Sequence, residues 1–261
     1  MSDAGDRAVP DPLRGAAVPE ATAAIEAVDL EVGYGHLPVL RGLSMAVRPG
    51  EIVSLLGANG AGKTTTLLAL AGVLSPISGS VLMSGRPAPV GLHRRAAAGL
   101  ALICEDRSVF MGLTCRENLR LGRGSIEDSL ELMPDLEPLL DRKVGLMSGG
   151  EQQMLTLARA LAGRPSVLLA DELTLGLAPL IVARLLACLR TAADRGVGVL
   201  IVEERAKRAL QVSDRVCVLR RGEIVMEGTA VEMSSRVAEI EASYLSETAD
   251  AAVSGPRSIE Q

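Results

Sequence analysis

Short apolar runs alternate with longer stretches of helical periodicity along most of the chain. Compact apolar runs, which favour buried strands, occur at Glu51–Leu56, Val167–Ala170, Gly198–Val202 and Val216–Leu219. Two further segments, Ile25–Val32 and Ser44–Val47, alternate apolar and polar residues and predict strands with one exposed face. Arg221–Gly222 predicts a hairpin turn before a strand at Glu223–Met226. Strands separated by helices indicate an α/β fold with a mostly parallel sheet and an antiparallel β edge.

Helical patterns are predicted at Lys63–Ala71, Ile126–Met133, Leu136–Leu140 and Glu151–Ala162. The stretch of about 87–147 is mainly helical and predicts an insertion into the α/β core. Residues 1–24 and 247–261 are rich in Ala, Ser, Pro, Gly and charge, which predicts disordered tails around one domain at 25–246.

Composition narrows the classes of function. The net charge of -5 gives no electrostatic reason to expect a nucleic-acid partner. The four cysteines form no CxxC pair, which favours a reducing compartment over a disulfide framework or a zinc site. No signal peptide and no run of about 18 apolar residues is visible, so we expect a cytosolic protein without a transmembrane segment.

A glycine-rich turn between a predicted strand and a predicted helix fits the P-loop pattern. Its residues, with Thr65 added to the predicted phosphate-binding set, are Gly57, Ala58, Asn59, Gly60, Ala61, Gly62, Lys63 and Thr64. Backbone N–H groups and the helix N-terminus suit phosphate binding. We expect Lys63 to reach the β and γ oxygens of ATP and Thr64 to bind Mg²⁺. A ligand-free turn remains the alternative.

The apolar strand Val167–Ala170 ends in Asp171 and Glu172. Next to a P-loop, this predicts that Asp171 holds Mg²⁺ and that Glu172 polarises the attacking water as a general base. By itself, such a pair of acids is also typical of a strand that ends in a solvated loop.

A second candidate anion site is formed by Ser148, Gly149, Gly150 and Glu151, which open a predicted helix. Ser148 suits the N-cap position, and the glycines leave backbone amides open. One chain needs one phosphate cradle, so a second cradle suggests a nucleotide shared between two chains. A well-capped helix after a flexible loop is the alternative.

The segment Ser148–Gln153 resembles the signature sequence of ABC ATPases, and its place between the P-loop and Asp171 matches theirs. The resemblance covers about 25–246. It implies the ABC ATPase fold, which is a P-loop NTPase (RecA-like) core with a helical insertion. It also implies a head-to-tail dimer in which two ATP molecules lie between one P-loop and the other subunit's Ser148 segment. Tyr34 matches the residue that stacks on adenine; a tyrosine packed on the sheet is the alternative.

Finer features resemble the subunits of branched-chain amino acid transporters. These are Glu105–Phe110, Glu117–Leu119, Thr174–Pro179 and Ile201–Glu203. The branch has Glu where most ABC ATPases have Gln, so Glu105 is a candidate both for catalysis and for Mg²⁺. Urea and amide transporters use closely similar subunits. The resemblance implies a peripheral protein on the cytoplasmic face of the membrane. Its implied partners are a second, non-identical ABC ATPase, permease subunits and, indirectly, an extracytoplasmic solute-binding protein.

Several positions depart from the family pattern, and Cys104, Asp106 and Met147 are among them. Glu204 stands where a His or Gln normally contacts the γ-phosphate, and Leu173 replaces the Pro after the catalytic Glu. At about 4 Å from the γ-phosphate, a carboxylate meets repulsion of several kcal/mol at an effective dielectric near 20. Glu204 either turns away to pair with a base such as Arg205 or becomes protonated when ATP is bound. We therefore expect a slow ATPase, and a non-catalytic, nucleotide-gated subunit is the alternative.

Overall fold

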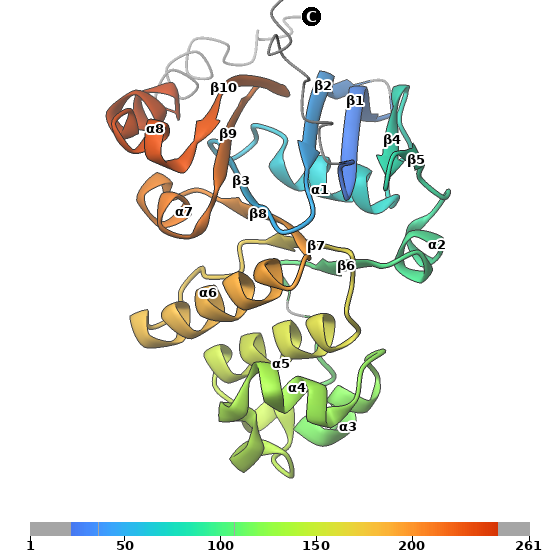
Figure 1. Ribbon diagram of the computed structural model, residues 1–261, viewed down its shortest axis with the longest axis vertical. Helices are drawn as coiled ribbons and strands as arrows, with labels where there is room; N and C mark the ends of the chain where they lie inside the picture. The colour runs from blue at the N-terminus through green and yellow to red at the C-terminus, as the bar shows by residue number, and fades with distance from the viewer. Residues whose placement is uncertain (1–21, 36, 107, 245–261) are drawn as a thin grey trace, which may run out of the picture.

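The computed structural model describes residues 22–35, 37–106 and 108–244. The predicted tails therefore lie outside the described residues, except for 22–24. Figure 1 shows two sheets in the upper part of the molecule and a helical part at the opposite end. The helical part contains α3 (Cys115–Arg120), α4 (Ile126–Leu132) and α5 (Gly149–Ala162). In the described residues no helix is both long and apolar enough to span a bilayer.

The larger sheet has six strands in the order β10-β9-β3-β8-β7-β6. Its strands are β3 (Ile52–Leu56), β6 (Leu100–Ile103), β7 (Val167–Asp171), β8 (Gly198–Glu203), β9 (Arg215–Arg220) and β10 (Glu223–Thr229). All neighbours are parallel except β9 and β10, which form the predicted hairpin around Arg221 and Gly222. The predicted parallel core with an antiparallel edge is confirmed.

The smaller sheet is antiparallel and has the order β2-β1-β4-β5. Its strands are β1 (Ile25–Tyr34), β2 (Leu37–Val47), β4 (Ser78–Met83) and β5 (Arg86–Pro87). Apolar side chains of β1 and β2 pack with α1 (Lys63–Ala71) and one face of the larger sheet. This packing fixes β1, with Tyr34 at its end, close to α1.

The central strands are buried on both faces. Along β7, Val167 and Leu169 face the cluster with α1, whereas Leu168 and Ala170 face the cluster with α5 and α6 (Pro179–Asp194). Successive side chains of a strand point to opposite faces, so a strand covered on both sides appears as a continuous apolar run. Asp171, the last residue of β7, and Glu172 after it consequently lie at the edge of a rigid core.

Helices cover the rest of the sheet and form the insertion. They are α2 (Leu92–Ala97), α3 (Cys115–Arg120), α4 (Ile126–Leu132), α5 (Gly149–Ala162), α6 (Pro179–Asp194), α7 (Ala206–Val212) and α8 (Ala230–Ser234), with 3-10 turns at Pro134–Leu139 and Val144–Leu146. The predicted insertion of about 87–147 includes β6, which pairs with β7 and belongs to the core. Its four apolar residues are too few for periodicity to separate a core strand from the helices around it.

Candidate functional site

The candidate site lies where parallel strands of the larger sheet end. β3 runs into the glycine-rich turn before α1, and β7 ends at Asp171, with Glu172 after it. β6 ends shortly before Glu105, and β8 ends shortly before Glu204. The carboxyl ends of parallel strands are the usual place for ligands in open α/β sheets. Four segments that are far apart in sequence thus meet at one edge.

The turn after β3 needs glycine at two positions for different reasons. A Cβ on Gly57 would lie 2.5 Å from the carbonyl oxygen of Leu219, so the two backbones approach too closely for a side chain. Gly62, the N-cap of α1, has φ of 109°, which L side chains rarely adopt. These constraints place the backbone N–H groups at the start of α1 around a small space.

Lys63 and residues of the turn line a cavity of about 300 Å³. The lining residues include Asn59, Gly60, Gly62, Lys63, Thr64, Thr65 and Glu172. Lys63 Nζ donates to the carbonyl oxygens of Gly57 and Ala58 at 2.8 and 2.9 Å. The ammonium group is therefore held over the turn, beside the predicted general base.

Thr64 and Asp171 are 107 positions apart in sequence, and the fold brings them into contact. Thr64 Oγ1 donates to Asp171 Oδ2 at 2.9 Å. Asp171 Oδ1 is buried and has no hydrogen-bond partner among the described residues. A hydroxyl and a carboxylate with one unpartnered oxygen are the hard oxygen donors that Mg²⁺ prefers. The pair fits the predicted magnesium site, with nucleotide phosphates and water as the remaining ligands.

Glu105 lines a second cavity, of about 470 Å³, together with Thr64, Cys104, Asp106 and Asp171. The described residues contain no cluster of three or more His, Cys, Asp or Glu side chains that could hold a metal ion. Glu105 thus shares a cavity with Thr64 and Asp171, and its role as a magnesium ligand stays a prediction.

Negative charge accumulates around Glu172. Burial raises the pKa of Glu172, the carboxylates of Glu204, Glu105 and Asp171 raise it further, and Lys63 opposes them. The pKa of Asp171 is raised chiefly by burial, against the hydrogen bond from Thr64. A carboxylate with a raised pKa is a stronger base once deprotonated, which suits proton abstraction from water.

Tyr34 is half exposed, and its hydroxyl lies 3.5 Å from Thr65 Oγ1. Its ring is therefore neither buried in the sheet nor far from the start of α1. This position is compatible with the predicted adenine contact.

Ser148 lines neither of the two cavities at the P-loop. Its N–H donates to Glu151 Oε2 at 2.6 Å, and its hydroxyl accepts from the N–H of Glu151 at 3.3 Å. This capping box starts α5 in the helical part of the molecule, where Figure 1 shows α5 next to α3 and α4. Within one chain, the Ser148 segment is thus separate from the predicted phosphate cradle.

Several residues that line the two cavities were not singled out as site residues from the sequence, among them Val39, Cys104 and Asp106. Val39 lines the cavity with Asn59, and Cys104 lines the cavity with Asp171. Only its position beside Glu105 could have indicated Cys104. Val39 has no such signal, because only the tertiary packing of β2 against the start of α1 brings it to the turn.

Comparisons with known proteins agree with this geometry. The family model described as "ABC transporter" matches residues 40–175. The chain is 40% identical over 211 residues to the high-affinity branched-chain amino acid transport ATP-binding protein BraG of Pseudomonas aeruginosa, covering 77% of this chain and 90% of BraG. It is 37% identical over 217 residues to the Nod factor export ATP-binding protein I of Burkholderia orbicola, covering 79% and 71%.

A solved ATP-binding subunit of an ABC transporter superposes with a TM-score of 0.73 at 27% identity, covering 86% of this chain and 99% of that one. The family match spans the P-loop, the Ser148 segment and Asp171. The chain therefore belongs to the ABC transporter family, as an ATP-binding subunit.

Proposed function

We propose that the chain hydrolyses Mg-ATP in a head-to-tail dimer and thereby drives a membrane permease. The contact between Thr64 and Asp171, with Glu172 next in sequence and Lys63 in the same cavity, is the observation that carries this proposal. Such a set combines phosphate binding, a metal site and a base, which are the parts that phosphoryl transfer to water needs.

Each residue has a separate role in the proposed reaction. Backbone N–H groups of residues 57–64 hold the β-phosphate, and Lys63 stabilises charge on the phosphoryl group that is transferred. Thr64 and Asp171 would hold Mg²⁺, which when bound neutralises charge on the phosphate oxygens. Glu172 orients the attacking water and accepts its proton. The Ser148 segment of a second subunit closes the site, and Tyr34 stacks on adenine.

Steady-state hydrolysis of Mg-ATP by the purified protein at high concentration tests this proposal. Glu172→Gln is the matched control, because it keeps the size of the side chain and removes the base. We expect activity in the wild type and its loss in Glu172→Gln, with ATP binding retained. Equal turnover by both proteins would contradict the role of Glu172.

A non-catalytic, nucleotide-gated subunit is the second candidate, and the charge of Glu204 near Glu172 favours it. Tight ATP binding without turnover, even with the partner ATPase present, would support this candidate and exclude the first.

Transport of branched-chain or related amino acids is the substrate class that we propose. The 40% identity to BraG supports it, whereas the similarity to a Nod factor export protein shows that related subunits serve other cargo. Urea and amides are the alternative cargo. Uptake of labelled leucine, compared with labelled urea, in cells with and without this chain separates the two classes.

The proposed partners are a non-identical ABC ATPase, permease subunits and, through them, an extracytoplasmic solute-binding protein. The chain would sit peripherally on the cytoplasmic face of the membrane. Isolation of the membrane complex tests this arrangement. Two copies of this chain without a second ATPase would contradict the predicted heterodimer.

A further inference from the structure

A buried polar network lies beneath the loop that follows Glu172. Thr174 Oγ1 donates a hydrogen bond to Glu203 Oε1, and Arg208 Nη1 donates to Thr174 Oγ1 at 2.9 Å and to Thr174 O at 3.1 Å. Thr174 and Glu203 are only 2% and 7% exposed. Three elements thus meet at one hydroxyl: the loop after β7, the end of β8 and α7.

The hydroxyl of Thr174 links a carboxylate to a guanidinium group. It gives its one hydrogen to Glu203 and accepts from Arg208, so both charged groups depend on it. Burial raises the pKa of Glu203, while Thr174 and Arg208 lower it. A carboxylate in this position is costly to bury unless these partners remain in place.

The backbone of Glu172 adopts an unfavourable conformation that this network is placed to hold. Glu172 has φ of 45°, in the left-handed region that residues with a Cβ rarely occupy. Its N–H donates to the carbonyl oxygen of Val202 at 3.2 Å, and its carbonyl oxygen accepts from Leu175 N–H at 3.2 Å. Such a conformation persists only where the surroundings fix it. Leu173, which follows, has no ring to restrict its φ.

We propose that Arg208 is a positioning residue that, through Thr174 and Glu203, holds the loop 173–177 and so aims the Glu172 carboxylate. This inference rests on the proposed function, because it assigns Glu172 the role of general base. Val202 fixes Glu172 from one side, and the network fixes the chain two residues later. Together they leave the intervening Leu173, itself 2% exposed, little freedom.

Two substitutions remove the network in different ways. Arg208→Gln removes the guanidinium group on α7. Thr174→Val keeps the shape of the side chain and removes the hydroxyl that joins Glu203 to Arg208. Thr174→Ser retains the hydroxyl and is the conservative rescue. Lys207→Gln is the matched control, because Lys207 is the exposed neighbour of Arg208 on α7 and carries the same charge.

Steady-state kinetics of the full chain separate positioning from nucleotide binding. In Arg208→Gln and Thr174→Val we expect kcat for ATP to fall on the order of 10- to 100-fold, as for a misplaced catalytic group. KM for ATP should stay within about twofold, because the cradle for the phosphates is untouched. Thr174→Ser and Lys207→Gln should retain the kcat of the wild type.

Amide hydrogen exchange of the same proteins gives a readout that does not need hydrolysis. We expect faster exchange in 173–177 for Arg208→Gln and Thr174→Val, with unchanged exchange in the turn 57–64. Unchanged kcat and unchanged exchange in both variants would overturn the proposal. A third outcome is faster exchange in the variants together with a wild type that hydrolyses no ATP. It would show that the network anchors the loop but that the proposed hydrolytic function fails.

Discussion

At the scale of single residues, Glu204 is the least usual feature of the site. It directly follows β8 and is partly exposed, and its charge contributes to the raised pKa of Glu172. The resemblance to ABC ATPases also predicts that Glu204 faces the terminal phosphate of ATP. Repulsion at that point would oppose ATP binding more than ADP binding, since ADP lacks the γ-phosphate.

Substitution of Glu204 should therefore act selectively. In Glu204→Gln we expect at least several-fold tighter binding of ATP, with binding of ADP nearly unchanged, measured by calorimetry in the presence of Mg²⁺. Glu204→His should in addition raise kcat. Turnover by Glu204→His that does not exceed the wild-type rate would remove Glu204 as the cause of slow hydrolysis.

Asp171 provides a second test at this scale. Asp171→Asn keeps the volume of the side chain but replaces one carboxylate oxygen with an NH₂ donor. That donor either faces Thr64 or takes the place of Oδ1, the oxygen without a hydrogen-bond partner among the described residues. We expect the Mg²⁺ concentration at the midpoint of the titration to rise by roughly tenfold or more, as when ligand geometry at a metal site is disturbed. Titration of Mg²⁺ at fixed ATP measures this, and an unchanged midpoint would exclude Asp171 as a ligand.

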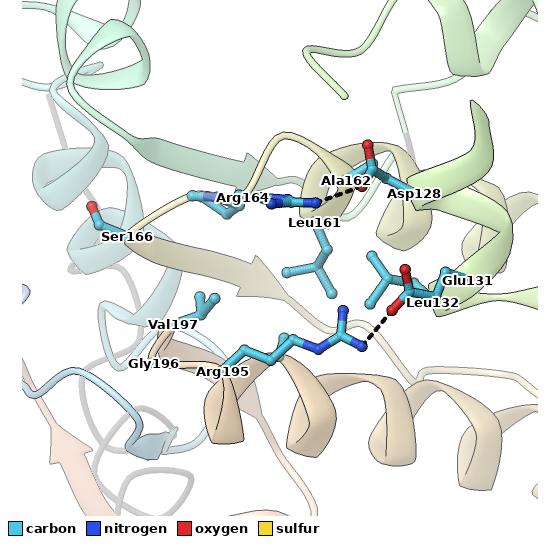
Figure 2. A pocket seen from close by; sticks show the side chains of 12 residues that line it. Asp128, Glu131, Leu132, Leu161, Ala162, Arg164, Ser166, Arg195, Gly196 and Val197 are labelled. Carbon is cyan, nitrogen blue, oxygen red and sulfur yellow. Dashed lines mark hydrogen bonds and ion pairs between the residues drawn. The ribbon is translucent and has the colours of Figure 1, made fainter. Parts of the chain in front are cut away.

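At the scale of elements, ion pairs connect α4 and the turn after it to neighbouring segments, with all of the acids on one side and all of the arginines on the other. The acids are on α4 and the turn after it. The arginines are on α6, directly after α6 and in the segment before β7: Asp135 pairs with Arg184, Glu131 with Arg195, and Asp128 with Arg164. Figure 2 shows the last two pairs across a groove of about 560 Å³, with Leu161 and Leu132 between them. These pairs connect the helical part to the core.

The pair at Asp128 predicts a pH dependence of stability. Hydrogen bonds from Ser125 and Arg164 lower the pKa of Asp128 to about 2, below its unfolded value. A depressed pKa stabilises the fold above the unfolded pKa, and this stabilisation is lost as the pH falls toward about 2.

We therefore expect Asp128→Asn to unfold at a lower urea concentration than the wild type at pH 6. The two midpoints should converge as the pH is lowered from 4 toward about 2. A difference that is constant across this range would show that the charge of Asp128 contributes nothing.

Most of these elements were predictable from the sequence. The limits of α1 match the prediction, and the capping box at Ser148 follows from residues three positions apart. β6 was harder to assign to the core, because four apolar residues carry no period that distinguishes a strand from a helix. The contacts of Thr174 with Glu203 and Arg208 were out of reach, since 29 and 34 positions separate the partners.

At the scale of the whole molecule, the separation of the Ser148 segment from the P-loop predicts that two chains complete one site. Lys63→Ala disables the P-loop of a chain, and Ser148→Arg disables its second cradle. In a mixed dimer of these two variants, one site combines an intact P-loop with an intact Ser148 segment. We expect the mixture to hydrolyse ATP although each variant alone does not. A mixture without activity would contradict a shared site in dimers of this chain.

The sequence by itself determined the chemistry and the local structure. Three motifs are local: the P-loop with its glycines and Lys63, the apolar strand that leads to Asp171, and the cap at Ser148. Each spans only a few residues, so each can be recognised from the sequence. Only the tertiary structure decided which of them meet. Packing of β3 between β8 and β9 and of α1 beneath β7 brings Thr64 to Asp171 and leaves Ser148 apart. Contacts between distant segments depend on the burial of the whole core, which no local pattern encodes.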